Sequence, residues 1–386
     1  MLDRIRSRVR RDRLLDTATR LVAVPSPTGN AGAALDALAN RLREDGFTVQ
    51  REVAGHPSGP AVIARLDSGR PGKCLQFNGH LDVVHLPFVP PRIEDNLLRG
   101  SGSCDMKGGT AAAVEALRVL RDDKLLERGS VLFIGHDLHE APWGLGGQLD
   151  DLIRRGIHGN AVLIPEPMCA SLPVIGRGCA TWKVTLRRSG APVHEVMRPA
   201  DEPSIIAAGA DFVRQVAELD ARISNGSDSP AGKPSAFIGQ IHSGEIYNQY
   251  PQECMLEGTR RWLPGANGRE LEAEFRDLVA GVERQHGVTS TIEWRHIRGA
   301  FEINESDPFV TVFQNCHAAV SGKRLPFGPK PFVDDGNSFS SLGGIPAITH
   351  GPRAGGQHTV DEWVDVDDLM RVAVLYALTA VTYLNG

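Results

Sequence analysis

The stretch Phe77-Asn78-Gly79-His80-Leu81-Asp82-Val83-Val84 decides the fold class, because it is typical of a buried strand that ends in a His-x-Asp pair. An apolar run from Cys74 to Phe77 leads into it. The carboxyl ends of strands form the ligand-binding edge of open α/β sheets, so we expect His80 and Asp82 at such an edge. A metal-bound imidazole needs an acceptor for its second nitrogen, and Asp82 is close enough in sequence to supply one. Without further support, a histidine at a strand end is more often structural.

The composition places the chain among ordinary globular proteins. Its 386 residues are enough for two domains, or for one large domain with an insertion. The net charge of -5 gives no reason to expect nucleic acid as a partner, and no apolar stretch is long enough to span a membrane. The six cysteines include no C-x-x-C pair, which indicates neither a disulfide framework nor a thiolate zinc site and favours a cytoplasmic location.

Helical and strand patterns alternate through the first part of the chain. The basic segment 4–13 has acidic interruptions and no apolar run after it, so we interpret it as a solvated helix that extends to about residue 21 rather than a targeting signal. Further helices are expected over 34–42 and 111–120, and strands over 48–53 and 61–66. This alternation predicts an α/β sheet that is covered on both faces.

Three more segments carry metal-binding types of side chain next to a strand or helix. Asp105 lies in a glycine-rich stretch before a helix, His139-Glu140 follows a strand over 130–135, and Glu166 follows a strand over 160–164. Asp105 alone could be a helix cap, and the glycine spacing fits neither nucleotide-binding pattern. Because these groups recur at what should be one end of the sheet, we predict that they form a common site.

The pattern changes between about residues 176 and 297. The order strand, helix, strand, strand, helix, strand suggests a ferredoxin-like domain inserted into the larger one. The six expected elements span 180–188, 203–218, 236–242, 252–262, 269–286 and 290–295. The first domain is expected to resume with a helix over 308–321, a loop over 334–338, a strand over 347–350 and a last helix over 366–383. The predicted domains are therefore 1–176 and 298–386 for the catalytic domain and 177–297 for the insertion.

Four motifs together resemble those of the dinuclear-metal aminoacylase and carboxypeptidase family, which includes acetylornithine deacetylase, succinyl-diaminopimelate desuccinylase and glutamate carboxypeptidase. The motifs are Gly79-His80-Leu81-Asp82, Gly102 to Gly109 around Asp105, Glu166-Pro167, and His358-Thr359-Val360-Asp361-Glu362. The resemblance covers nearly the whole chain. It implies an α/β fold in which a mixed-sheet, zinc-peptidase-like catalytic domain carries an inserted α+β ferredoxin-like lid and dimerisation domain.

The resemblance also implies two divalent metal ions. They would be zinc first, with cobalt or manganese as alternatives, because nitrogen and oxygen ligands without a soft donor do not favour copper. The implied ligands are the terminal ligands His80 and Glu166, the bridging carboxylate Asp105, and the remaining ligands Glu140 and His358. Asp82 would hold His80 in orientation. Two such ions would activate a shared water and polarise the scissile carbonyl.

The largest departure from the family pattern lies at His139-Glu140, where relatives carry two glutamates. The ligand Glu140 is kept and the usual glutamate base is replaced by His139, whose imidazole could accept the proton instead or become a metal ligand. His136 or Asp137 could also be recruited as the base. A second departure is His85, where relatives favour proline.

In the insertion, three residues match functional positions of the family. His194 would reach the active site of a dimer partner and stabilise the oxyanion, which implies a homodimer formed through the inserted domain. Asn248 and Arg261 match substrate-binding positions. Arg261 suits a substrate carboxylate, because its guanidinium can donate two parallel hydrogen bonds.

These residues predict a metal-dependent hydrolase that cleaves an amide bond in a small carboxylate-bearing substrate, such as an N-acyl amino acid or a dipeptide. Two alternatives remain open at this point. The altered base could mark another reaction at the same metals, such as hydrolytic deamination or acyl transfer. The chain could also be a metal- or ligand-binding homologue with little turnover.

Overall fold

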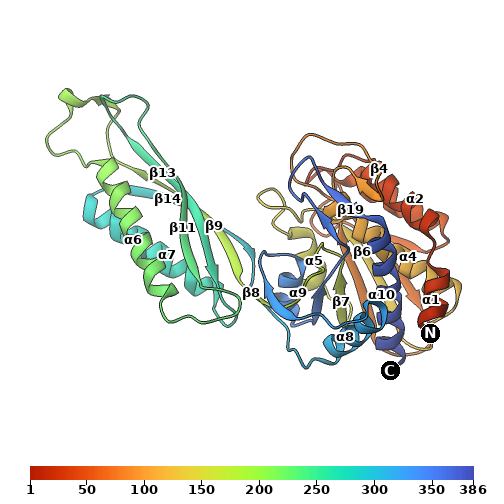
Figure 1. The fold of residues 1–386 in the computed structure, drawn as a ribbon. Helices are drawn as coiled ribbons and strands as arrows, with labels where there is room; N and C mark the ends of the chain where they lie inside the picture. The colour runs from red at the N-terminus through yellow and green to blue at the C-terminus, as the bar shows by residue number, and fades with distance from the viewer. The chain divides into compact units, whose positions relative to one another are not determined.

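The computed structural model describes residues 1–386, which form two compact units (Figure 1). Unit 1 comprises Met1–Val174, Phe301–Pro329 and Asp334–Gly386. Unit 2 comprises Ile175–Ala300 and Lys330–Val333. The chain therefore leaves unit 1 near residue 174 and returns to it near residue 301.

A six-stranded mixed sheet forms the centre of unit 1, in the order β1-β2-β6-β3-β7-β17. Its strands are β1 (Val49–Glu52), β2 (Ala61–Asp67), β3 (Cys74–His80), β6 (Ser130–His136), β7 (Ala161–Ile164) and β17 (Ala347–Thr349). β3 is parallel to both β6 and β7, and β17 is parallel to β7. β1 and β2 are antiparallel to their neighbours, so the predicted mixed sheet is confirmed.

Helices cover both faces of this sheet. Along β6, Val131 and Phe133 belong to one apolar cluster with α2, α3, α4, α8 and α10, whereas Leu132 and Ile134 pack in a second cluster with Leu152 of α5. The side chains of one strand point alternately to its two faces, so one run of apolar residues packs against the helices on both faces of the sheet. The helices of unit 1 are α1 (Leu2–Arg8), α2 (Arg11–Val22), α3 (Gly32–Glu44), α4 (Gly108–Asp122), α5 (Gly147–Arg154), α8 (Pro308–Ser321), α9 (Asp335–Gly343) and α10 (Val366–Asn385).

Two sequence-based expectations about unit 1 are wrong. The first expected helix is broken into α1 and α2, because Val9 and Arg10 are extended and the Arg10 N–H donates to Glu115 Oε1 at 3.0 Å. The expected loop around 334–338 is the start of α9. Asp334 caps this helix, and the Asn337 side chain completes a capping box with it.

A small sheet that the sequence did not predict lies beside the main one in unit 1. It has the order β18-β19-β5-β4, formed by β18 (Ala354–Gly355), β19 (Trp363–Asp365), β5 (Leu97–Arg99) and β4 (Arg92–Glu94). The connection between β18 and β19 contains His358. Three further short strands are β8 (Leu172–Gly176), β15 (Phe301–Glu302) and β16 (Phe327–Lys330).

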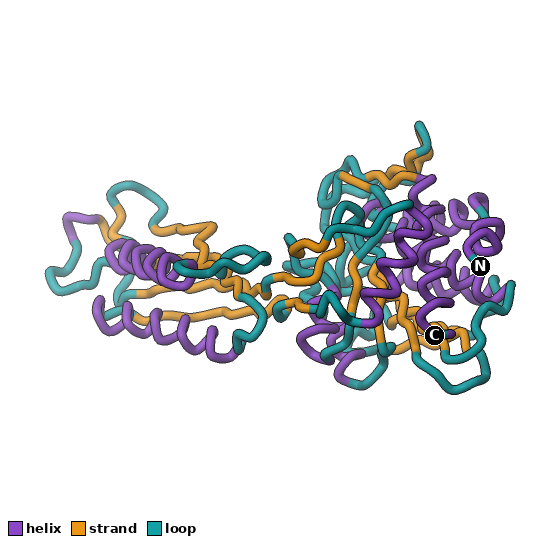
Figure 2. Tube along the Cα trace, turned by 60° about the horizontal axis from the view of Figure 1, so that its bottom comes forward, coloured by secondary structure: helices purple, strands orange, loops and turns teal.

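Unit 2 has a four-stranded antiparallel sheet in the order β11-β13-β9-β14. Its strands are β9 (Gly178–Arg187), β11 (Ser235–Ser243), β13 (Glu253–Trp262) and β14 (Thr289–Arg298). α6 (Ile205–Ser224) and α7 (Gly268–His286) run alongside these strands and share an apolar core with them (Figure 2). The shorter strands β10 (Val193–His194) and β12 (Gln249–Tyr250) pair with each other.

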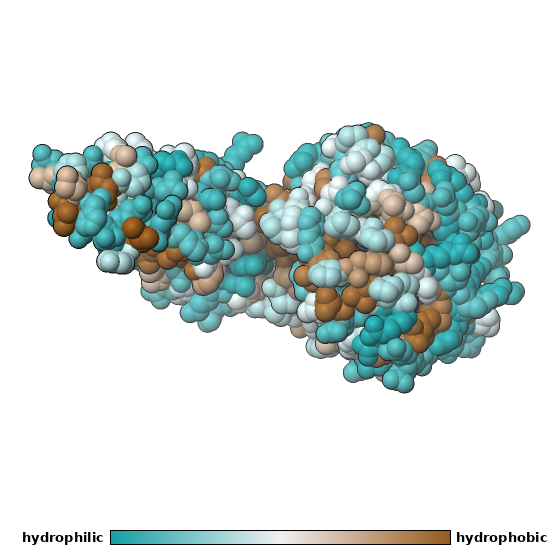
Figure 3. All heavy atoms as spheres, turned by 90° about the horizontal axis from the view of Figure 1, so that it is seen from above, coloured by the Kyte–Doolittle hydropathy of each residue, from teal (hydrophilic) through white to brown (hydrophobic).

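The surfaces of the two units are mixed in character. Figure 3 shows apolar side chains interspersed with hydrophilic ones on each unit. None of the helices combines the length and the apolar character that a membrane crossing requires.

Candidate metal centre

The carboxyl ends of three parallel strands bring the first candidate ligands together. β3 ends at His80, directly beside His136 at the end of β6, and β7 ends two residues before Glu166. His139 and Glu140 follow β6 after a short turn. Because parallel strands end at the same sheet edge, residues that are far apart in sequence meet here.

Asp105 lies between two histidines. It sits in the irregular turn Ser103–Lys107 before α4, with an extended backbone. Its Oδ1 atom is 3.1 Å from His80 Nε2, and its Oδ2 atom is 3.3 Å from His358 Nε2. Each carboxylate oxygen therefore faces a different imidazole, which is the arrangement of a carboxylate shared by two ions.

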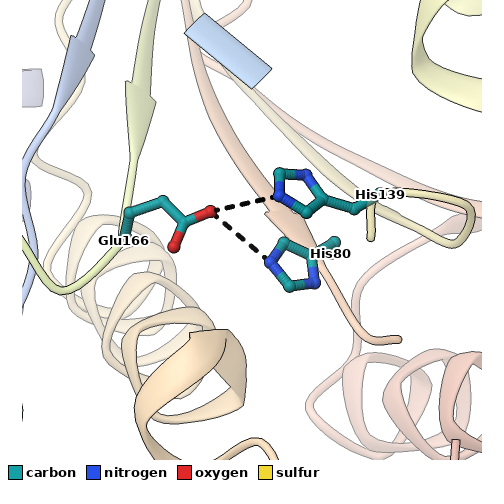
Figure 4. A group of neighbouring side chains, drawn as sticks. All are labelled: His80, His139 and Glu166. Carbon is teal, nitrogen blue, oxygen red and sulfur yellow. Dashed lines mark ion pairs between the residues drawn. The ribbon is translucent and has the colours of Figure 1, made fainter. Parts of the chain in front are cut away.

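The remaining ligand atoms divide between these two sides. Glu166 Oε1 is 3.4 Å from His80 Nε2 and 3.7 Å from His139 Nε2 (Figure 4). Glu140 Oε2 is 3.3 Å from His358 Nε2. The ligands of a tetrahedral zinc ion, with bonds of ~2.05 Å, lie ~3.3 Å from one another. The distances among the five predicted ligands fit that spacing, and their nitrogen and oxygen donors suit two divalent ions.

The electrostatics of the cluster also fit bound cations. Burial and the charge of Asp105 raise the pKa of Glu166 to about 8. Burial opposes ionisation of Asp105, but hydrogen bonds from His358 and His80 outweigh it and lower the pKa of Asp105. Hydrogen bonds to Asp105 and Glu140 raise the pKa of His358 to about 10. Positive charge at this position, from protons or metal ions, therefore balances several buried carboxylates.

Asp82 contacts both His80 and the loop after β6. His80 Nδ1 is 3.0 Å from the Asp82 backbone carbonyl and 3.6 Å from the carboxylate. The other carboxylate oxygen, Oδ2, accepts hydrogen bonds from the backbone N–H groups of His139 and Glu140 at 3.0 and 3.1 Å. The carboxylate of Asp82 thus fixes the backbone that carries these two residues.

The His139 ring is held by a residue that sequence reasoning missed. Asp335, the first residue of α9, is fully buried, and its Oδ1 atom is 2.7 Å from His139 Nδ1. The ring also stacks on His80, with centroids 3.9 Å apart. Burial and His80 oppose protonation of His139, but Asp335 and Glu166 outweigh them and raise its pKa to about 9. A metal dication nearby would lower the pKa of His139, because it repels the positive charge of the protonated ring.

A second missed residue, Glu362, supports the turn that carries Asp105. Glu362 Oε2 accepts hydrogen bonds from the backbone N–H groups of Cys104 and Asp105 at 3.2 and 3.3 Å. Burial and the charge of Asp105 raise the pKa of Glu362 to about 7. Glu362 is the last residue of the His358-to-Glu362 motif, and this was the sequence feature from which its role could have been predicted.

His136 and Asp137, the two residues that could replace His139 as the base, contact other groups. His136 Nε2 is 2.8 Å from Asp335 Oδ2. The Asp137 carboxylate accepts hydrogen bonds from the N–H groups of Gly29 and Ala31 and lies 3.0 Å from His56 Nε2. Asp137 therefore organises the 29–31 loop.

His85, the second departure from the family pattern, stacks on Trp143 with ring centroids 4.1 Å apart. Its Nε2 atom also lies 3.0 Å from the Thr28 carbonyl oxygen. Trp143 follows three residues after Glu140, so the stacking connects His85 to the loop that begins with the first departure, His139-Glu140.

The other predicted site residues belong to unit 2. Asn248 Nδ2 lies 3.0 Å from His194 Nε2, so these two side chains are neighbours. Arg261 is near the far end of β13, ~26 Å along the strand from Glu253, where β13 begins. Unit 2 therefore brings His194 and Asn248 together but keeps Arg261 away from them.

The mixed sheet, the inserted unit and the paired histidine–carboxylate groups define a dinuclear-metal hydrolase of amide bonds. The chain belongs to peptidase family M20/M25/M40, whose model matches residues 76–382. The fold is therefore that of a metal-dependent amidohydrolase or peptidase with two divalent ions, as the sequence predicted.

Individual relatives agree with this assignment. The chain is 27% identical to a succinyl-diaminopimelate desuccinylase of Methylobacterium radiotolerans, over 97% of this chain and 98% of that protein. Aminopeptidase PepT of Bacillus cereus has the same fold, with a TM-score of 0.80, 20% identity and coverage of 97% and 99%. A dinuclear metal-binding peptidase from Bacillus subtilis aligns with a TM-score of 0.70, 16% identity and coverage of 97% and 98%.

Proposed function

We propose that this protein hydrolyses the amide bond of a small carboxylate-bearing substrate, an N-acyl amino acid or a dipeptide. The observation that carries the proposal is the position of Asp105 between two groups of ligand atoms. The names of the relatives support the substrate class, because a desuccinylase and an aminopeptidase both release an amine from an amide.

In this proposal, His80, Glu166 and Asp105 hold one ion, and Asp105, Glu140 and His358 hold the other. We propose zinc for both, because two imidazoles and three carboxylates form a borderline donor set. When bound, such ions supply Lewis-acid activation of water and of the scissile carbonyl. Asp82 keeps the loop of Glu140 in place through its hydrogen bonds to the backbone.

His139 is the proposed proton carrier. Its Nε2 atom faces Glu166 Oε1 at 3.7 Å, so it points toward the ligand atoms, and its side chain is only 9% exposed. An imidazole at this position can take a proton from the attacking water and return it to the leaving nitrogen.

Residues of unit 2 are proposed to recognise the substrate across a homodimer. Arg261 would bind the substrate carboxylate, and His194 with Asn248 would serve the partner subunit's active site. The separation of Arg261 from His194 within one unit supports a contribution from two chains. The edge strand β11 exposes Phe237 and Ile241, which are 60% and 49% accessible, and it offers unpaired backbone groups for association.

The test is to strip the metals, reconstitute the protein with zinc, cobalt or manganese, and record product masses from a substrate panel. The panel contains N-succinyl and N-acetyl amino acids, dipeptides and tripeptides, with matched substrates whose carboxylate is amidated. We expect metal-dependent release of an amine and an acid, and loss of activity on the amidated substrates.

Asp105→Ala is the control for contaminating hydrolases. Products that do not differ between this variant and the wild type would contradict the proposal. Ammonia release or acyl transfer to an amine acceptor, without the free acid, would show one of the altered reactions instead.

A further inference from the structure

A buried network connects His139 to α9 and to two strand ends. Asp335 receives polar contacts on both carboxylate oxygens. Oδ1 contacts His139 Nδ1 at 2.7 Å, and Oδ2 contacts His136 Nε2 and the Asn78 amide nitrogen, each at 2.8 Å. All of these groups belong to unit 1, and Asp335 has no exposed surface.

The contact with Asp335 determines which nitrogen of His139 carries the proton in the neutral ring. An ionised carboxylate only accepts hydrogen bonds, so Nδ1 must donate to Oδ1. Both oxygens of Asp335 lie within 2.8 Å of nitrogen atoms, those of His139, His136 and the Asn78 amide, which is the environment of an ionised carboxylate. The lone pair of neutral His139 is then on Nε2, the atom that faces Glu166.

The ring of His139 stacks on the ring of His80, with an angle of 8° and centroids 3.9 Å apart. Its Nε2 atom lies 3.7 Å from Glu166 Oε1, and His80, His139 and Glu166 together form a group that could hold an ion. In the proposed division of ligands, His80, Glu166 and Asp105 would hold that ion, and His139 Nε2 would be left to accept a proton.

Separate contacts hold the backbone and the ring of His139. The Asp82 carboxylate accepts the backbone N–H of His139, whereas Asp335 contacts only the ring. Asp335 is itself fixed by the cap of α9, where Thr349 Oγ1 donates to Asp334 Oδ2 at 2.7 Å. Removing the contact to the ring should therefore leave the loop of His139 in place.

We propose that Asp335 is a positioning residue for catalysis, which holds the His139 ring with its proton on Nδ1 and its lone pair directed at the reacting atoms. This inference rests on the proposed hydrolysis. His139 Nε2 takes a proton as the water oxygen bonds to the carbonyl carbon, and it gives that proton to the leaving nitrogen as the C–N bond breaks. Asp335 contacts neither substrate nor reacting atoms and acts through His139 alone.

The test compares Asp335→Asn with Ser340→Ala, which removes the side-chain hydrogen bonds between Ser340 and the Glu302 backbone from the same helix, α9. For Asp335→Asn we expect kcat to fall by at least ~10-fold, with metal content and KM little changed. Ser340→Ala should retain kcat. In the His139→Ala background, Asp335→Asn should cause no further loss, because its effect passes through that ring.

The second readout is the tautomer of His139, which is measured by ¹⁵N NMR of zinc-loaded protein labelled at histidine. The His139→Ala variant identifies the signal of this ring. We expect the proton on Nδ1 in the wild type and a changed state in Asp335→Asn. A wild-type proton on Nε2 would overturn the proposal, even if the variant does not fold. An additional loss from Asp335→Asn in the His139→Ala background would also overturn it, because that result indicates a purely structural role.

The two proposals fail in different ways. If the wild-type protein cleaves no amide, the proposed hydrolysis is wrong, and the tautomer still reports whether Asp335 holds His139. If the wild type cleaves amides and Asp335→Asn keeps both kcat and the tautomer, only the positioning role is wrong.

Discussion

Asp105 connects ligand atoms that come from the first and the last of the three sequence segments of unit 1. Its partner His80 ends β3, whereas His358 lies close to the C-terminal helix and has a backbone φ of +59°. A non-glycine residue in this left-handed region is uncommon, so the surrounding chain must hold it there. In the proposed centre two ions would share this carboxylate, so the loss of its side chain should affect both.

We predict that Asp105→Ala removes both metals, whereas His139→Ala keeps them and loses turnover. The first variant lacks the shared ligand, and the second lacks only the proton carrier. Metal content after exhaustive dialysis, measured by inductively coupled plasma mass spectrometry, distinguishes them. Two retained ions in Asp105→Ala would exclude it as the shared ligand, and normal turnover in His139→Ala would exclude that residue from proton transfer.

His350 predicts a specific dependence of stability on pH. Burial and the charge of Arg371 lower its folded-state pKa to about 3, against ~6.5 in the unfolded chain. Below pH ~6.5 the unfolded state therefore binds a proton that the folded state excludes. Stability contributed by neutral His350 is lost as the pH falls from there toward 3, by up to ~1.4 kcal/mol per pH unit.

The check is urea unfolding of wild type and His350→Leu at about pH 7 and about pH 5.5, where the wild type should lose ~1 kcal/mol more than the variant. Groups distant from His350 titrate equally in both proteins, so the difference reports on His350 and on its neighbours His317 and Asp368. Equal losses in the two proteins would show that this ring does not remain neutral.

At the scale of elements, the close approach of α4 to the end of β7 positions Glu166. A Cβ atom on Gly109, in the first turn of α4, would lie 2.1 Å from the Pro165 carbonyl oxygen. Only a hydrogen atom fits at this contact. The glycine-rich stretch before α4 thus serves the packing of the element next to the site.

We predict that Gly109→Ala destabilises unit 1 by ~1–3 kcal/mol and weakens metal binding, because Pro165 must move together with Glu166. Gly147→Ala at the start of α5 is the matched control, since a Cβ there meets nothing within 4 Å. Thermal unfolding and zinc titration measure the two effects. A Gly109→Ala protein with wild-type values in both would show that this contact does not constrain Glu166.

Long periodic elements and local motifs could be predicted from the sequence, and the long-range network could not. The strands β6 and β7 have continuous apolar runs and β3 is rich in apolar residues, so the ligands that follow them could be located. Short strands such as β5 and β19 lack the length for a recognisable pattern. Asp335 was missed because it lies 196 residues from His139 and its Asp-Asp-Gly-Asn-Ser surroundings are typical of a loop.

At the scale of the whole molecule, unit 2 presents a sheet edge suited to pairing with another chain. β11 is an edge strand with exposed apolar side chains, and edge strands of this kind pair readily with another chain. The proposed homodimer would use this edge. It would also explain why His194 and Arg261 are at different ends of one unit.

We predict that mixing two inactive proteins, His194→Ala and Asp105→Ala, restores part of the activity. A hybrid dimer would contain one active site with intact ligands and with His194 from the other chain. Subunit exchange is verified with two affinity tags, and activity is measured on the purified hybrid. A hybrid with no activity would exclude a contribution of His194 to the partner subunit.

The hydrogen bonds from Cys104 and Asp105 to Glu362 have a consequence for the order in which the protein is made. During synthesis, β3, α4, β6 and β7 emerge first, then the whole of unit 2, and only afterwards Asp335, His358 and Glu362. Until those last residues emerge, the turn that carries Asp105 lacks its support, and the second imidazole is missing. With the proposed ligands, the nascent chain would complete its two-ion centre only after Glu362 has emerged, so we expect metal uptake to follow the synthesis of all of unit 2.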